Sequence, residues 1–94
     1  MLANTIQVRN AIRKAAETVD GRVGTIWTNK SRTGGDLRFI GAEVGRDKAA
    51  HIAAEARTIL ENAGFCNRVY FTRAHDVGSW RNTLDYVRAD AVLA

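Results

Sequence analysis

The amino-acid sequence predicts an α+β domain built as a two-layer sandwich, with helices on one face of a mainly antiparallel sheet. Two observations support this fold class. Residues 4–19 and 47–63 repeat apolar side chains at spacings of three and four, which is typical of helices with one buried side. Residues 22–28, 37–44 and 66–73 form short runs rich in β-branched and aromatic residues, which favours strands.

Length and composition set the outer limits of the prediction. A chain of 94 residues can close only one hydrophobic core, so we expect a single domain over 1–94. One cysteine, Cys66, excludes an internal disulfide and favours a reducing compartment. No segment has the roughly 20 apolar residues of a membrane span, and the N-terminus lacks the apolar core of a signal peptide. We therefore expect a cytoplasmic protein that makes no membrane contact.

The first helix is expected over residues 4–19. Asn4 or Thr5 can cap its start, because their side-chain oxygens accept hydrogen bonds from the first free amides. Asp20 and Gly21 end it with a residue that tolerates positive φ. The outer side of the helix is basic and is typical of a solvated surface; it carries Arg9, Arg13 and Lys14.

A β-hairpin follows, and the rest of the chain is organised around it. Its strands are expected near 22–28 and 37–44, on either side of the polar loop 29–36. The loop contains Lys30, Arg32 and two consecutive glycines, so the tip of the hairpin is positively charged.

The second helix is the clearest element of the sequence, and its narrow alanine-rich side is suited to close packing on a sheet. Asp47 can serve as its N-cap, and Gly64 takes the C′ position, where a left-handed residue is favoured. Phe65 then folds back as the hydrophobic contact that accompanies such a cap. The third strand follows over 66–73.

The tail, residues 80–94, fits two interpretations. One helical side would hold Trp80, Leu84, Val87 and Ala91. Alternatively Val87, Ala89, Ala91 and Leu93 alternate against Arg88, Asp90 and Val92, as in a half-buried strand. We favour the strand, because the order α-β-β-α-β-β is that of a ferredoxin-like βαββαβ sandwich with its first strand moved to the end, a circular permutation. A helical tail would leave an α+β fold with three strands.

Alternation assigns two different sides to the predicted sheet. The side expected to meet the helices is aliphatic and contains Ile26, Ile40, Ala42, Val44, Val69 and Phe71. The opposite side then gathers Trp27, Phe39 and Tyr70 with Arg68. In the first strand, the same alternation puts Val23 on the side of Trp27. A shift of one residue in a strand limit would reverse the assignment for that strand.

An exposed sheet face with aromatic and basic side chains is how several proteins bind single-stranded nucleic acid, since bases stack on the rings and cations neutralise phosphates. The net charge of +4 permits such a partner. The binding residues we expect are Trp27, Lys30, Arg32, Phe39, Arg68 and Tyr70. Alternatively these rings are buried, under the tail or against a second copy in a homodimer, because apolar patches usually mark interfaces.

Candidate catalytic and metal-binding residues are sparse. One side of the second helix carries three potential metal ligands spaced one turn apart, Asp47, His51 and Glu55. Three ligands at most are more typical of a solvent-exposed side of a helix than of a metal site. An extended strand would separate Cys66 from His75 by about 30 Å. The His75–Asp76 dipeptide remains the best catalytic fragment. The hairpin loop 29–36, with its two glycines, is followed by a strand instead of a helix, so it departs from the phosphate-loop pattern.

The sequence therefore predicts a small cytoplasmic binding protein that is not an enzyme and uses no cofactor or metal. The leading hypothesis is association with nucleic acid, or with a protein of a nucleic-acid-handling complex, through the basic hairpin tip and the sheet aromatics. The alternative is a protein-interaction module: a homodimer, or a small adaptor or inhibitor of the kind that phages and other mobile elements of bacteria encode.

Overall fold

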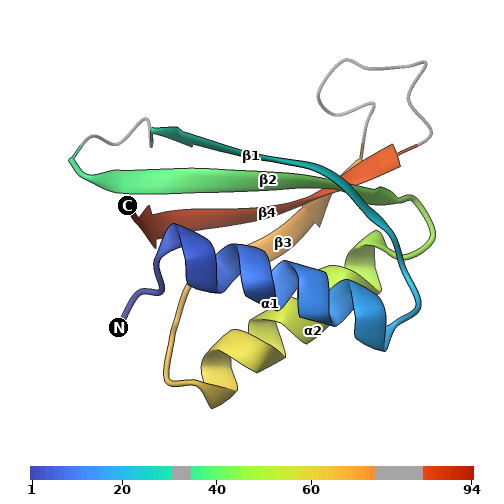
Figure 1. Cartoon of the computed structure of the whole chain (residues 1–94), viewed down its shortest axis with the longest axis horizontal. Helices are drawn as coiled ribbons and strands as arrows, with labels where there is room; N and C mark the ends of the chain where they lie inside the picture. Colours follow the sequence, from blue (N-terminus) through green and yellow to red (C-terminus); the bar gives the residue numbers. More distant parts are fainter. Residues whose placement is uncertain (31–34, 74–83) are drawn as a thin grey trace.

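The computed structural model describes residues 1–30, 35–73 and 84–94, and Figure 1 shows both helices on one side of a single sheet. The elements are α1 (Thr5–Thr18), β1 (Val23–Lys30), β2 (Leu37–Gly45), α2 (Ala49–Asn62), β3 (Val69–Thr72) and β4 (Leu84–Leu93). The predicted α+β class and two-layer arrangement are confirmed, and the described part of the tail contains a strand, β4. Within the described residues, no helix is long and apolar enough to cross a membrane.

The sheet has the strand order β1-β2-β4-β3, and every neighbouring pair is antiparallel. The tail strand β4 therefore lies inside the sheet, between β2 and β3, and β1 and β3 form the two edges. The start of α1 lies beside the end of β4: Asn4 forms an isolated bridge with Leu93, whose amide donates to the carbonyl of Ala3 at 3.0 Å.

Helix α1 begins and ends with well-formed caps. Asn4 and Gln7 form a capping box, in which each side chain accepts from the other residue's amide at 2.9 Å. At the other end, the Gly21 amide donates to the Ala16 carbonyl at 2.7 Å, which is one bond of a Schellman motif. The residue in the left-handed conformation is Asp20 (φ 55°), so the glycine is not the one that supplies positive φ.

Helix α2 starts one residue later than the sequence suggested. Lys48 is its N-cap and no side chain caps it, so the prediction that Asp47 is the cap is wrong. The C-terminus follows the prediction: Gly64 has φ 90°, and the Phe65 amide donates to the Leu60 carbonyl at 2.9 Å. Phe65 packs against the core.

The hydrophobic core fills the space between the helices and one face of the sheet. Its largest fully buried side chains are Val8, Ile12, Ile40, Val44, Ile52, Val87 and Val92. Each such burial stabilises the fold by roughly 1.5–3 kcal/mol relative to an exposed side chain. Because β4 is central, its alternate residues Val87 and Ala89 are as deeply buried as Ile40 of β2.

A β-bulge in β1 changes the side assignment near its start. Val23 pairs with Val44 and Ile26 pairs with Ala42, so Gly24 and Thr25 together oppose one residue of β2. Val23 and Ile26 consequently both pack against the core. The prediction that Val23 shares a side with Trp27 is therefore wrong.

A second bulge lies near the end of β4, where Arg38 pairs with Val92 but Ile40 pairs with Ala89. Two residues of β4, one of them Ala91 at φ 54°, fit between these pairs. Val92 is thereby turned into the core and Leu93 is 42% exposed. The predicted alternation, which had Leu93 inward and Val92 outward, is wrong beyond the bulge. The predicted third strand is also shorter, because regular pairing starts only at Val69.

Candidate functional site

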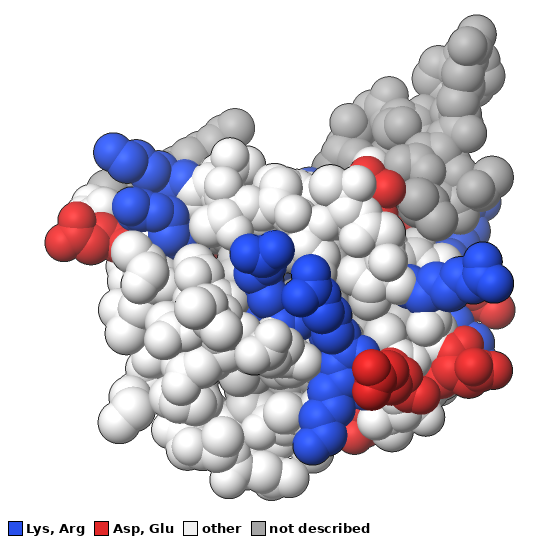
Figure 2. Space-filling model, viewed as in Figure 1, with Lys and Arg blue, Asp and Glu red and all other residues white. Residues whose placement is uncertain are grey.

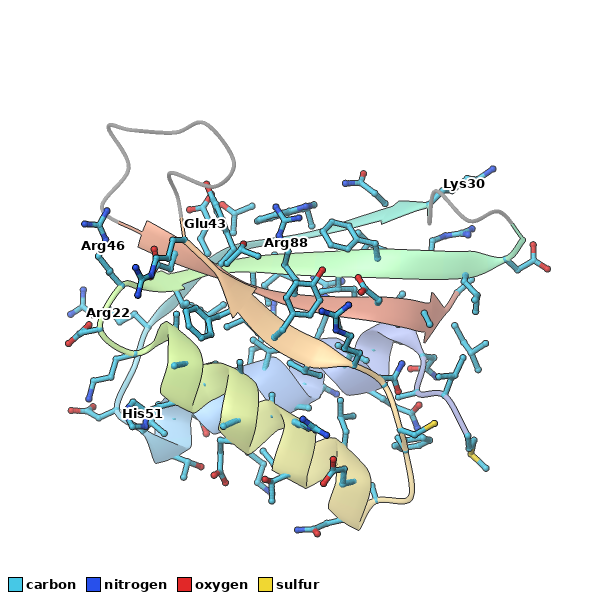
Figure 3. All side chains as sticks on the ribbon, turned by 180° about the vertical axis from the view of Figure 1, so that it is seen from behind. Arg22, Lys30, Glu43, Arg46, His51 and Arg88 are labelled. Carbon is cyan, nitrogen blue, oxygen red and sulfur yellow. The ribbon has the colours of Figure 1, made fainter. Side chains whose placement is uncertain are left out.

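The sheet face turned away from the helices is the most distinctive surface of the described chain. We call it the open face; it displays Trp27 and Phe39 from the first hairpin, Tyr86 and Arg88 from β4, and Tyr70 and Arg68 from β3 or its start. Figure 1 shows α1 and α2 on the other side of the sheet, and Figure 3 shows Arg88 and Glu43 pointing away from the helical layer.

Strand register brings residues from all four strands into one row. Trp27 pairs with Gly41, Gly41 pairs with Arg88, and Arg88 pairs with Tyr70. Directly opposed residues on neighbouring strands are close enough for their side chains to interact. The row therefore places an arginine in the middle of the sheet, with a glycine on one side and a tyrosine on the other.

Gly41 provides the space that the Trp27 ring occupies. A Cβ atom added at Gly41 would overlap the indole, coming within 2.9 Å of its Cη2 atom and closer to two other ring atoms. Trp27 can therefore lie across β2 and reach Tyr86 of β4, with ring centroids 5.4 Å apart and planes at 84°. This edge-to-face arrangement is favourable for aromatic pairs. Both rings remain half-buried, so part of each is accessible to a partner.

Arg88 lies among the rings of the open face. Its guanidinium carbon is 5.1 Å from the centre of the Phe39 ring and 5.9 Å from that of Tyr86, within the range of cation–π attraction. Its Nε atom is buried without a hydrogen-bond partner, and no carboxylate of the described chain forms an ion pair with it. Contacts with the rings therefore hold the arginine, and no acid among the described residues forms an ion pair with it.

Arg68 and Tyr70 form a second cluster with Asp90. The Arg68 guanidinium lies 4.4 Å from the Tyr70 ring centre and 3.6 Å from a carboxylate oxygen of Asp90. The Tyr70 hydroxyl donates to the other oxygen at 3.2 Å. Burial and the Asp90 carboxylate raise the pKa of Tyr70, so the phenol is neutral at physiological pH. Arg68 offers less uncompensated charge than Arg88, because an acid already faces it.

The sequence-predicted site residues divide into three groups. Trp27, Phe39, Tyr70 and Arg68 lie together on the open face, as the alternation indicated. Lys30 pairs with Arg38 at the end of β1, on the opposite side of that strand from Trp27, and Figure 3 shows it far from Arg88. The remaining residue, Arg32, is outside the described residues.

Sequence reasoning missed two residues of the open face, Tyr86 and Arg88. A signal for both existed, because they alternate with Val87 and Ala89 in the tail. This alternation is informative only if the tail is a strand, and the apolar residues of the tail fit a helical period nearly as well.

A second basic surface lies on the helical layer. Figure 2 shows lysine and arginine side chains running across this side of the molecule, with acidic side chains close to one end of the run. Helix α1 contributes Arg9, Arg13 and Lys14. No aromatic ring of the described chain accompanies them on α1, so this surface can attract phosphates but offers no platform for bases.

The catalytic and metal-binding candidates gain no support from the geometry. His51 and Asp47 are exposed and Glu55 is half-buried, and no cluster of three potential metal ligands occurs in the described parts of the chain. Cys66 is exposed and its thiol donates to the Met1 carbonyl at 3.2 Å. The His75–Asp76 dipeptide lies outside the described residues.

A shallow hollow of about 540 Å³ lies where α2 begins, beside β3 and β4. Its lining mixes both signs of charge, since it includes Arg46, Arg73, Asp47 and the buried Asp85, with Arg46 and Asp85 3.9 Å apart. This mixture favours no ligand class.

The chain matches no protein-family model, no curated protein and no solved structure.

Proposed function

We propose that the protein is a small non-enzymatic module that binds single-stranded nucleic acid on the open face. The observation that supports this is the row across the sheet in which Arg88, without an acidic partner among the described residues, lies between aromatic rings. Rings of this kind stack on bases, each contributing roughly 1–3 kcal/mol, while arginine contacts the phosphate backbone.

The geometry favours single strands over duplexes. The rings of Trp27, Phe39 and Tyr86 lie on a sheet surface, where they can meet only bases whose faces are exposed. Bases in a duplex are stacked on one another and present only their edges in the grooves. The net charge of +4 adds a sequence-independent attraction that weakens with salt.

We also propose that the fold is a circular permutation of a known arrangement. Connecting the end of β4 to the start of α1, which the Leu93–Ala3 hydrogen bond already brings together, would produce the order β-α-β-β-α-β. We therefore regard the protein as a circularly permuted ferredoxin-like sandwich. In this proposal the chain acts in the cytoplasm, uses no cofactor, and partners nucleic acid or a protein that handles it.

Fluorescence anisotropy with labelled oligonucleotides tests the proposal. We expect single-stranded DNA or RNA to bind at about 50 mM salt and to be released at about 200 mM, with duplexes of the same length binding more weakly. Arg88→Gln should weaken binding by about 10- to 150-fold, since a charge-assisted contact is worth roughly 1.5–3 kcal/mol. Arg13→Gln removes the same charge from the helical layer and is the matched control.

Two outcomes contradict the proposal: no binding at the lower salt concentration, or equal losses in Arg88→Gln and Arg13→Gln. Lys30→Ala combined with Arg32→Ala tests the hairpin tip separately. We expect this pair to reduce the salt dependence of binding, because a tip contact to phosphate adds charge but no stacking.

A protein-interaction module is the second candidate function. The observation that favours it is the partial burial of Trp27, Phe39 and Tyr86, since half-buried aromatic residues are common at protein interfaces. A protein partner retained by the wild-type chain but lost in Phe39→Ala, together with no nucleic-acid binding at low salt, would favour this candidate over the first.

A further inference from the structure

The two edges of the sheet differ in length and charge. β3 has four residues, and an arginine stands immediately on each side of it, Arg68 and Arg73. β1 has eight residues and no charged side chain between Arg22 and Lys30. Proteins commonly protect exposed edges with charges, proline, bulges or short strands, because an open edge is a template for pairing. By these criteria β3 is protected and β1 is much less so.

Part of β1 presents a regular, open edge. In the described chain β1 pairs only with β2, and no other backbone hydrogen bond reaches its residues. The bulge at Gly24 and Thr25 interrupts the first half of the strand. From Ile26 to Lys30 the pairing with β2 is uninterrupted, so this segment offers an outward row of amides and carbonyls.

We propose that the segment Ile26–Lys30 pairs with the same segment of a second copy, antiparallel about a two-fold axis at Thr28, to form a dimer with one eight-stranded sheet. In this register Thr28 faces its own equivalent, Trp27 faces Asn29, and Ile26 faces Lys30. No like charges are opposed, and paired threonines are favourable across antiparallel strands. The contact is self-complementary, as a two-fold interface requires.

The charge of the segment is compatible with a second copy at this edge. The segment has one cation at one end, and the two-fold register moves that cation as far as possible from its equivalent. The same register places both open faces on the same side of the joined sheet, with a Trp27 on each side of the axis. If the open face binds nucleic acid, dimerisation would double the length of the binding surface; only this last consequence rests on the proposed function.

Substitution of Thr28 tests both the edge and the register. Thr28 is exposed, so the monomer should tolerate glutamate or lysine there. Thr28→Glu places two carboxylates directly across the axis, and Thr28→Lys does the same with two ammonium groups. Each change should weaken the dimer by about tenfold or more, because opposed like charges are unfavourable and each copy brings the same residue. An equimolar mixture of the two variants should associate again, as a heterodimer.

Sedimentation equilibrium from micromolar to millimolar protein, without nucleic acid, provides the measurement. A wild-type dimer, two weakened variants and a restored mixture would support the proposal. Thr58→Glu and Thr58→Lys change an exposed threonine of α2 and should leave the dimer intact. A wild-type monomer throughout, a dimer insensitive to charge at Thr28, or equal effects at Thr58 would each overturn it.

Hydrogen exchange of the unmodified protein gives an independent readout in case a variant fails to fold. Outward amides between Ile26 and Lys30 should exchange more slowly as protein concentration rises, and those of β3 should not. Fast exchange of these β1 amides at every protein concentration would overturn the dimer. Because these experiments contain no nucleic acid, failure of the dimer and failure of nucleic-acid binding are distinguishable.

Discussion

Replacing Gly41 with alanine tests whether the lack of a side chain at this position of β2 allows the Trp27 ring to adopt its orientation on the open face. The added Cβ would overlap the indole ring, so either Trp27 moves or the two strands separate. Overpacking of this kind costs roughly 1–3 kcal/mol. Alanine offsets roughly 0.5–1 kcal/mol of this cost, because glycine is the worse residue inside a strand. We expect a net loss of about 1 kcal/mol in the free energy of unfolding.

Binding should suffer more than stability. A displaced Trp27 loses its edge contact with Tyr86 and its place in the row. If one stacked base is lost, affinity for a single-stranded oligonucleotide falls by about 5- to 150-fold, from roughly 1–3 kcal/mol per base. Urea unfolding measures the first quantity and anisotropy the second. Gly45→Ala, in the same strand, is the control, since its new Cβ would meet only an Asp47 oxygen at 3.5 Å.

A double-mutant cycle identifies the cause of the Gly41→Ala effect. In a Trp27→Leu background the indole is absent, so Gly41→Ala should become neutral or slightly stabilising. An equal cost of Gly41→Ala in both backgrounds, or unchanged oligonucleotide affinity in the single variant, would refute the reasoning that Gly41 positions the ring.

Three further predictions concern stability and ionisation. Ala91→Gly should stabilise the fold by about 1 kcal/mol in urea unfolding, because alanine is strained at φ 54° in the β4 bulge; a loss would contradict this. Asn67→Ala should cost about 3 kcal/mol, since the buried amide accepts from Ala3 at 2.7 Å and donates to Ala91 at 3.1 Å; a cost below 1 kcal/mol would argue against those bonds. The pKa of Tyr70, followed by NMR, should lie above its usual value of about 10 and fall in Asp90→Asn. Because folding raises this pKa, the stability it contributes is complete at neutral pH and is lost as pH rises above about 10; an Asp90→Asn variant with an unchanged Tyr70 pKa would be inconsistent with the contact.

The elements of the fold were predictable where local signals agreed with one another. Asn4 and Gly64 mark helix ends through their own side chain or backbone preference, and these caps form in the structure. Asp47 failed as a cap, because the chain enters α2 one residue later, at Lys48. Local chemistry favours the aspartate, whose carboxylate can accept from the first amides, yet the helix starts without any side-chain cap.

The two bulges were not predictable from alternation. A bulge is a property of a strand pair, since two residues on one strand must oppose one on the other. Gly24 gave a weak hint, because glycine inside a strand often marks a bulge. Ala91 gave none, because alanine rarely adopts positive φ. These shifts decide that Val23 and Val92 pack inward.

Each residue of the candidate site was predictable only where the sequence clearly indicated the strand that carries it. Trp27, Phe39 and Tyr70 followed from the alternation of three strands. Arg88 and Tyr86 required the fourth, whose sequence also fits a helix. The contacts of Arg88 with the rings depend on strand order, because β4 lies between β2 and β3 only in the folded sheet.

Amide chemical-shift mapping on the labelled protein tests the central claim most directly. A short single-stranded oligonucleotide is added at low salt, and shifts are followed along β1, β2, β4 and β3. We predict the largest changes at open-face residues, including Trp27, Phe39, Tyr70 and Arg88, with little change at the alternate residues that face the core. Shifts confined to α1 around Arg13, or none at all, would contradict the account.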